Sequence, residues 1–109
     1  MTRGRQGDPT DDAALLALFD LLGQRWALRV LWELRGSPLT YRGLADRVPE
    51  MSTGTLTYRL RDLRAANLVD HAGQGYELSS SGRELVDHLE ELRDWARRAN
   101  LPNRSAGQG

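Results

Sequence analysis

The fold is decided by the stretch Met51-Ser-Thr-Gly-Thr-Leu-Thr-Tyr-Arg-Leu-Arg-Asp-Leu-Arg64. Leu56, Leu60 and Leu63 recur in it at i, i+4 and i+7, which places them on one side of an α-helix. Ser52 stands where an N-cap residue accepts hydrogen bonds from the first free backbone N–H groups. The stretch therefore predicts a helix over residues 52–66 with a narrow apolar stripe.

The helix face opposite the leucines is polar. It carries Gly54, Thr57, Tyr58 and Arg61, with Thr53 in the first turn. Hydroxyl, phenol and guanidinium groups on an outer face suit the DNA major groove, where Arg, Ser and Thr meet phosphates and base edges. An ordinary solvent-facing helix has the same pattern, so the flanking segments have to separate the two interpretations.

Composition excludes several classes of protein. At 109 residues the chain is expected to form one domain, and it has no apolar run as long as a membrane span. The lack of cysteine excludes disulfides, thiolate chemistry and Cys-based zinc sites. There is no Gly-rich phosphate loop, nucleophile elbow or His-rich ligand motif. We therefore expect a cytoplasmic protein that is not an enzyme and has no membrane partner.

The formal net charge is zero, but the charges are unevenly distributed. Residues 21–64 hold eight arginines against four acidic residues, a balance of +4. The remaining residues hold seven arginines against eleven acidic residues, a balance of −4. A positive middle between acidic ends suits local contact with a polyanion.

Three helices are expected before the central one. Residues 10–22 form an amphipathic helix that Gly23 ends, and Trp26, Val30 and Leu34 mark the apolar stripe of a second. Thr40 is a plausible N-cap for a short third helix through Val48.

The periodicity changes after Asn67, which stands where a left-handed C-cap residue is wanted. Residues 68–71 and 76–78 predict two short strands joined by Ala72-Gly-Gln-Gly75, a β-hairpin. Ser79 then caps a long final helix whose apolar seam is Leu85, Leu89, Leu92 and Ala96. The expected fold is mostly α with a small β-hairpin, a winged helix-turn-helix over residues 10–100, with disordered tails at 1–9 and 101–109.

Five pieces of the sequence, in this order, carry a family resemblance. They are Gly23-Gln-Arg-Trp26 with Val30-Leu31 and Leu34; Pro38, Tyr41 and Leu44; Ser52, Leu56, Arg59-Leu60 and Leu63; Tyr76-Glu-Leu78-Ser79 with Gly82-Arg83 and Leu85; and Leu92 with Trp95. Together they resemble the HxlR-type winged-helix regulators over about residues 12–96. The resemblance implies a dimeric bacterial transcription regulator that dimerises through its first and last helices.

The departures from that family pattern concern DNA contact and sensing. Thr40 and Gly43 replace a basic residue and an acid that usually flank the aromatic residue of the third helix. The turn of the hairpin, Ala72-Gly-Gln-Gly75, is shorter than in the family's wing and uncharged, which argues against minor-groove contact by this wing. The family's N-terminal cysteine, which some members use to sense electrophiles, is absent from this chain.

The candidate DNA-binding residues lie on the third and fourth predicted helices. They are Arg42, Ser52, Thr53, Gly54, Thr57, Tyr58, Arg59 and Arg61. Arg59 lies on the flank of the stripe, so a phosphate contact and an ion pair with Asp62 or Glu50 both remain open. The first and last predicted helices have more apolar surface than one small core can bury, so we expect them to form a homodimer interface. Its candidate residues are Leu15, Phe19, Leu89, Leu92 and Trp95.

Trp32 and Leu28 fall outside the second helix's inner stripe. Burial against a partner subunit is one interpretation of this surface. The other is a pocket formed by Phe19, Leu28, Trp32 and Trp95 for a small apolar or aromatic effector. His71 and His88 have no metal-sensor spacing, so neither a metal nor a cofactor is expected.

Two functions follow from these observations. The first is a dimeric, sequence-specific DNA-binding regulator that places residues 52–66 in the major groove of a pseudo-palindromic operator. The second is a winged-helix module that has lost DNA reading and binds proteins or small ligands. Zero net charge, the short wing and Thr40 favour the second function, whereas Arg59, Arg61 and Arg64 favour the first.

Overall fold

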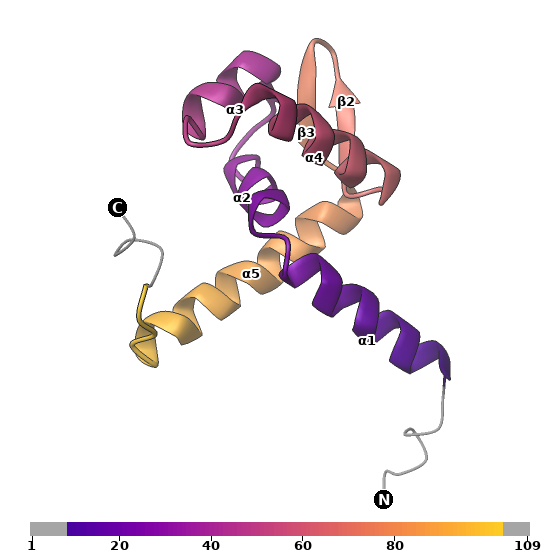
Figure 1. The fold of residues 1–109 in the computed structure, drawn as a ribbon, viewed down its shortest axis with the longest axis vertical. Coiled ribbons are helices and arrows are strands. Elements are labelled where there is room, and N and C mark those ends of the chain that lie inside the picture. The colour runs from indigo at the N-terminus through magenta and orange to yellow at the C-terminus, as the bar shows by residue number, and fades with distance from the viewer. Residues whose placement is uncertain (1–8, 104–109) are drawn as a thin grey trace, which may run out of the picture.

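The computed structural model describes residues 9–103, and within them it has five helices and a three-stranded sheet (Figure 1). In chain order the elements are α1 (Pro9–Leu22), α2 (Arg25–Glu33), β1 (Leu39–Thr40), α3 (Tyr41–Arg47), α4 (Thr53–Ala65), β2 (Val69–Ala72), β3 (Gly75–Leu78) and α5 (Ser80–Arg98). The predicted fold class, mostly α with a small β component in a winged helix-turn-helix, is confirmed. Residues 1–8 and 104–109, most of the two expected tails, lie outside the described residues.

The helix starts agree with the capping residues expected from the sequence. The side chains of Thr40, Ser52 and Ser79 each accept a hydrogen bond from the backbone N–H three residues on. Asn67 has a φ of 62°, the left-handed conformation expected after α4. These helix ends could be predicted from the sequence because a capping hydrogen bond joins residues only about three positions apart.

The sheet has one strand more than the hairpin expected from the sequence. Its order is β1-β3-β2, with both pairings antiparallel. The prediction lacked β1 because two residues show no period-2 pattern, and only their pairing with β3 makes them a strand. Gly75 permits that pairing, since a Cβ there would lie 2.5 Å from the Leu39 carbonyl oxygen.

The core lies between α2, α3, α4, the sheet and the start of α5. Its buried apolar members are Ala27, Val30, Leu31, Leu34, Leu44, Val48, Met51, Leu56, Leu60, Leu63, Val69, Leu78 and Val86. The three stripe leucines of α4 are 1%, 3% and 2% exposed, so the predicted inner face is confirmed. Trp26, which the sequence placed on the apolar stripe of α2, is partly buried and packs against this core.

Helices α1 and α5 extend away from this core in diverging directions (Figure 1). Each residue of α1 from position 12 to 20 is exposed, and among residues 12–22 only Leu21 packs on the core. The radius of gyration, 15.8 Å, exceeds the roughly 13 Å typical of a compact chain of this length. Among residues 9–103 no helix has the length and apolar character to cross a membrane.

Gly82 is expected to be essential for stability. It is buried at the start of α5, and a Cβ there would collide with the Leu68 carbonyl, which already accepts from the Ser79 N–H at 3.1 Å. Gly82→Ala should lower the free energy of unfolding by about 2–3 kcal/mol. Gly54→Ala is the matched control: the site is open, so stability should stay unchanged or rise by up to about 1 kcal/mol. Urea unfolding measures both, and equal effects would contradict the prediction.

Candidate nucleic-acid interface

The outer face of α4 is open to solvent. Gly54, Thr57, Tyr58 and Arg61 are all exposed, and Tyr58 is 52% exposed. They lie opposite the buried leucines because the stripe fixes the rotation of the helix about its axis. The sequence therefore assigned the outward face of α4 correctly.

The N-terminus of α4 combines a cap with free donors. The Ser52 hydroxyl accepts from the Thr55 N–H at 3.1 Å and donates to Thr55 Oγ1 at 2.9 Å. The N–H groups of Thr53 and Gly54 precede the helix's own hydrogen-bond ladder, and both residues are exposed. Gly54 has open space where a Cβ would stand, so a phosphate oxygen can approach these donors closely.

Tyr41 connects α3 to the start of α4. Its hydroxyl donates to the Thr53 carbonyl oxygen at 2.8 Å and lies 3.0 Å from Thr57 Oγ1. The sequence marked Tyr41 only as part of the family resemblance, and this contact was not expected. The signal was the phenol itself, because a partly buried tyrosine usually finds a partner for its hydroxyl.

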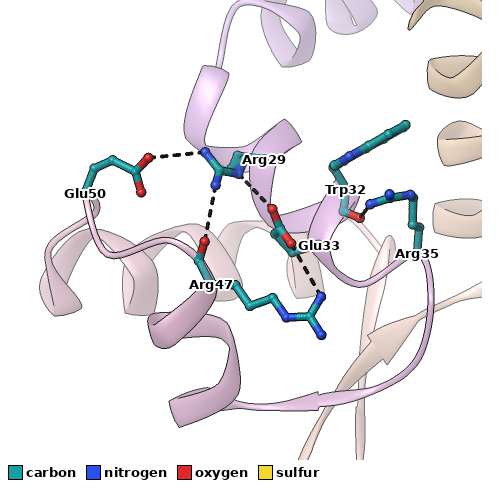
Figure 2. Close-up of polar contacts among 6 residues, drawn as sticks. All are labelled: Arg29, Trp32, Glu33, Arg35, Arg47 and Glu50. Atoms are coloured by element: carbon teal, nitrogen blue, oxygen red, sulfur yellow. Dashed lines mark hydrogen bonds and ion pairs between the residues drawn. The ribbon is translucent and has the colours of Figure 1, made fainter. Parts of the chain in front are cut away.

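An ion-pair network holds α2 against the turn that precedes α4 (Figure 2). Arg29 Nε donates to Glu33 Oε2 at 2.9 Å, and its Nη2 donates to the Arg47 carbonyl oxygen at 3.2 Å. Arg29 Nη1 lies 3.6 Å from Glu50 Oε2, and Arg47 Nη1 lies 3.7 Å from Glu33 Oε1. Sequence reasoning missed this network, although Arg29 and Glu33 stand four residues apart on one helix.

Arg59 forms one of the ion pairs that the sequence had left open. Its Nη1 lies 3.2 Å from Asp62 Oδ2, and its side chain is 26% exposed. Glu50, the other carboxylate considered, pairs with Arg29. In this conformation the Arg59 guanidinium lies along the helix, 5.1 Å from the centre of the Tyr58 ring, and its Nε is buried without a partner.

A hollow of about 150 Å³ separates α4 from the hairpin. It is lined by Thr57, Leu60, Arg61, Arg64 and Tyr76. The two arginines place positive charge beside the wing. Arg64 and Tyr76 were absent from the expected contact residues, because only the packing of the hairpin on α4 brings Tyr76 next to this helix.

The wing, residues 69–78, has little positive charge of its own. Its turn is Gly73-Gln74, and Gly73 has a φ of +58°, as at the first central position of a type II′ turn. Asp70 and Glu77 are cross-strand partners, so their carboxylates share one face of the hairpin. His71 and Tyr76 stack on the other face, with ring centroids 4.6 Å apart.

Arg42 is exposed on α3, as expected for a residue beside the DNA backbone. Within residues 9–103, no three His, Asp or Glu side chains gather in a group that could hold a metal ion.

The remaining expected residues lie on α1, α2 and α5. Leu15, Phe19, Leu92 and Trp95 are 46%, 55%, 50% and 49% exposed, whereas Leu89 packs partly buried against the core. Leu28 and Trp32 line a second groove together with Leu89. Phe19 and Trp95 are not among its lining residues, so a single chain does not bring the four expected pocket residues together.

The fold has a helical core, a β-hairpin wing and an exposed, arginine-bearing helix, α4, as the second helix of the helix-turn-helix. These features define the class of winged helix-turn-helix regulators. The model of the HxlR-like helix-turn-helix family matches residues 21–104. The chain belongs to this family of transcriptional regulators, which are not enzymes. The family resemblance seen in the sequence and the expectation that the protein is not an enzyme are therefore confirmed.

Individual relatives agree with this assignment. An uncharacterised HTH-type transcriptional regulator from Methanocaldococcus jannaschii is 24% identical over 84 residues, covering 73% of this chain and 79% of the relative. The structure resembles quinone-bound YodB from B. subtilis, with 26% identity and a TM-score of 0.74 over 79% of this chain and 98% of that one. It also resembles reduced HlyU from Vibrio cholerae, with 25% identity and a TM-score of 0.63 over 77% and 93% of the two chains.

Tyr41→Phe should loosen the start of α4. Losing the hydroxyl leaves the Thr53 carbonyl without that donor, so the free energy of unfolding should fall by about 0.5–1.5 kcal/mol. Tyr58→Phe is the control, because this exposed side chain makes no hydrogen bond through its hydroxyl among the described residues. Chemical denaturation of the two variants is the measurement. A Tyr41→Phe protein as stable as the control would show that the contact contributes nothing.

Proposed function

We propose that this protein is a homodimeric, sequence-specific DNA-binding regulator that inserts α4 into the major groove. The observation that supports this most is the outward face of α4. It presents Thr57, Tyr58 and Arg61, while the opposite leucines hold the helix on the core. Arg and hydroxyl side chains on such a helix suit base edges and phosphates.

Backbone contacts would fix the register of α4 on the duplex. The free N–H groups of Thr53 and Gly54 suit one phosphate, and two exposed arginines, Arg42 on α3 and Arg64 in the last turn of α4, suit others. Arg59 is the weaker candidate, since its guanidinium is already paired with Asp62. It would have to leave that carboxylate before it reached a phosphate.

The proposed dimer rests on the unburied apolar surface of α1 and α5. Leu15, Leu16 and Phe19 are 46%, 60% and 55% exposed on α1, and no monomeric core covers them. Beside α1 runs a groove of about 660 Å³ whose lining includes Ala14, Ala17, Ala65 and Ala66. Small side chains let a helix approach closely, and a second copy supplies exposed Leu92 and Trp95 on its α5. A twofold dimer would then present its α4 helices to half-sites about 34 Å apart.

The alternative function, a winged-helix module that does not read DNA, is favoured by the wing. Asp70 and Glu77 share its outer face, and its turn holds no charge. Carboxylates repel phosphates, so this wing suits the minor groove poorly.

A shift assay with DNA from upstream of its own gene, run at several salt concentrations, separates the two functions. Saturable binding, with a logarithm of the association constant that falls linearly with the logarithm of the salt concentration, supports the DNA-binding function.

Control by a thiol is not available to this chain, because it has no cysteine. The YodB structure that it resembles holds a quinone. We propose that any effector here is instead bound non-covalently at the surface of α2 that carries Trp32.

Arg61→Ala should weaken specific DNA binding by about 1–3 kcal/mol if the guanidinium meets a base edge, with relaxed preference at one position. If it meets only phosphate, affinity should fall similarly on all sequences and the salt slope should lessen by about one. Arg97→Ala, at the far end of α5, is the control and should bind like the wild type. Unchanged affinity and salt slope in Arg61→Ala would exclude this residue from the interface.

The protein should sediment as a dimer at micromolar concentration. Phe19→Asp should convert it to a folded monomer, because a carboxylate would be buried in the apolar interface. Tyr58→Asp replaces a similarly exposed aromatic residue on the DNA face and should remain dimeric. Analytical ultracentrifugation gives the mass, and circular dichroism checks the fold. A wild-type protein that sediments only as a monomer would exclude the dimer.

A further inference from the structure

A groove of about 320 Å³ lies between α2 and α5, away from the exposed face of α4. Its lining residues are Arg25, Leu28, Arg29, Trp32, Leu89 and Arg93. The volume lies at the lower end of small-molecule sites, which fits a ligand of one or two rings.

The lining combines an apolar surface with positive charge. Leu28, Trp32 and Leu89 supply the apolar part, and the three arginines supply cations, while no acidic side chain is among the lining residues. Such a mixture recognises a molecule that has an aromatic body and an anionic end, because each part meets its complement.

Two of the arginines keep free donors. Arg25 makes no ion pair among the described residues, and its guanidinium carbon lies 4.9 Å from the Trp26 ring centre. Arg93 uses Nε for Asp94 at 2.9 Å, which leaves its terminal nitrogens for another acceptor. A guanidinium binds a carboxylate with charge-assisted hydrogen bonds, often two at once.

Trp32 supplies a flat apolar surface. The guanidinium carbons of Arg35 and Arg93 lie 4.1 and 5.4 Å from its ring centre, so planar groups already stack around the indole. A bound aromatic ring would pack against Trp32 and Leu28, with its anionic end toward Arg93 and Arg25.

We propose that the groove between α2 and α5 binds a small planar aromatic carboxylate, held by Trp32 and Leu28 and paired with Arg93 and Arg25. The site also reaches the helix-turn-helix. Arg29 lines the groove and contacts Glu33, the Arg47 carbonyl and Glu50 in the turn before α4 (Figure 2). A carboxylate that draws Arg29 toward the groove competes with these contacts and alters the position of α4. This regulatory consequence rests on the proposed DNA-binding function, whereas the site itself does not.

The binding test uses 1-naphthoate and the full-length chain in isothermal titration calorimetry without DNA. Saturable binding is expected, and the neutral isostere 1-naphthamide should bind at least tenfold more weakly. Arg93→Gln should weaken 1-naphthoate about tenfold, and Arg97→Gln, on the same helix but outside the groove, should bind within twofold of the wild type. Arg25→Gln is the second variant should Arg93→Gln fail to fold.

A second readout locates the ligand. Three tryptophans give three indole N–H signals in a ¹⁵N correlation spectrum. 1-Naphthoate should move the Trp32 signal most and leave that of Trp95 nearly unchanged. Absence of binding at millimolar 1-naphthoate, equal binding of the amide, or an Arg93→Gln variant that binds normally would each overturn the proposal.

A separate titration tests the link to DNA. Saturating 1-naphthoate should change the affinity for the upstream DNA at least fivefold in the wild type, and Arg93→Gln should need about tenfold more ligand for the same change. Calorimetric binding with unchanged DNA affinity would retain the site and exclude the coupling through Arg29. A protein that binds 1-naphthoate but no DNA would instead count against the proposed function and leave the site standing.

Discussion

The structure depends on the burial of one narrow stripe, Leu56, Leu60 and Leu63 of α4, against the core. This burial fixes the rotation of α4 about its axis, and so it decides which side chains point outward. Burying three leucines contributes several kcal/mol, at about 1.5–3 kcal/mol each, which no surface contact of this helix equals. The polar face of α4 is therefore a consequence of the apolar one.

The contacts around α4 set its position rather than its rotation. Tyr41 holds its first turn from α3, and the Arg29–Glu33–Arg47–Glu50 network holds the turn before it from α2 (Figure 2). These polar contacts are partly exposed, and each contributes modestly. Because they are modest, a ligand that competes for one of them, as proposed for Arg29, would disturb the turn before α4 at a small cost compared with that of unfolding the core.

The central domain buries its apolar side chains, whereas the projecting helices α1 and α5 leave several of theirs exposed. The helix-turn-helix and sheet enclose a complete core, whereas α1 projects away from it (Figure 1). Several of its leucines and Phe19 are exposed, and none of residues 9–103 covers them. A contiguous exposed apolar surface is typical of a protein–protein interface, which is the physical basis for the proposed homodimer. The acidic outer face of the wing is unsuited to phosphates, so the proposed DNA-binding function depends on α4 rather than on the hairpin.

The sequence alone determined the elements whose signals are local. The leucine spacing predicted α4 and its outward face, and Thr40, Ser52, Ser79 and Asn67 predicted where helices begin and end. Only the tertiary structure decided β1, the hydroxyl contacts of Tyr41 and the meeting of Arg93 with Trp32 at one groove. The physical reason is sequence separation. A cap or a helical stripe is specified by neighbours a few residues apart, whereas a groove between α2 and α5 exists only after the core has folded and brought those distant side chains together.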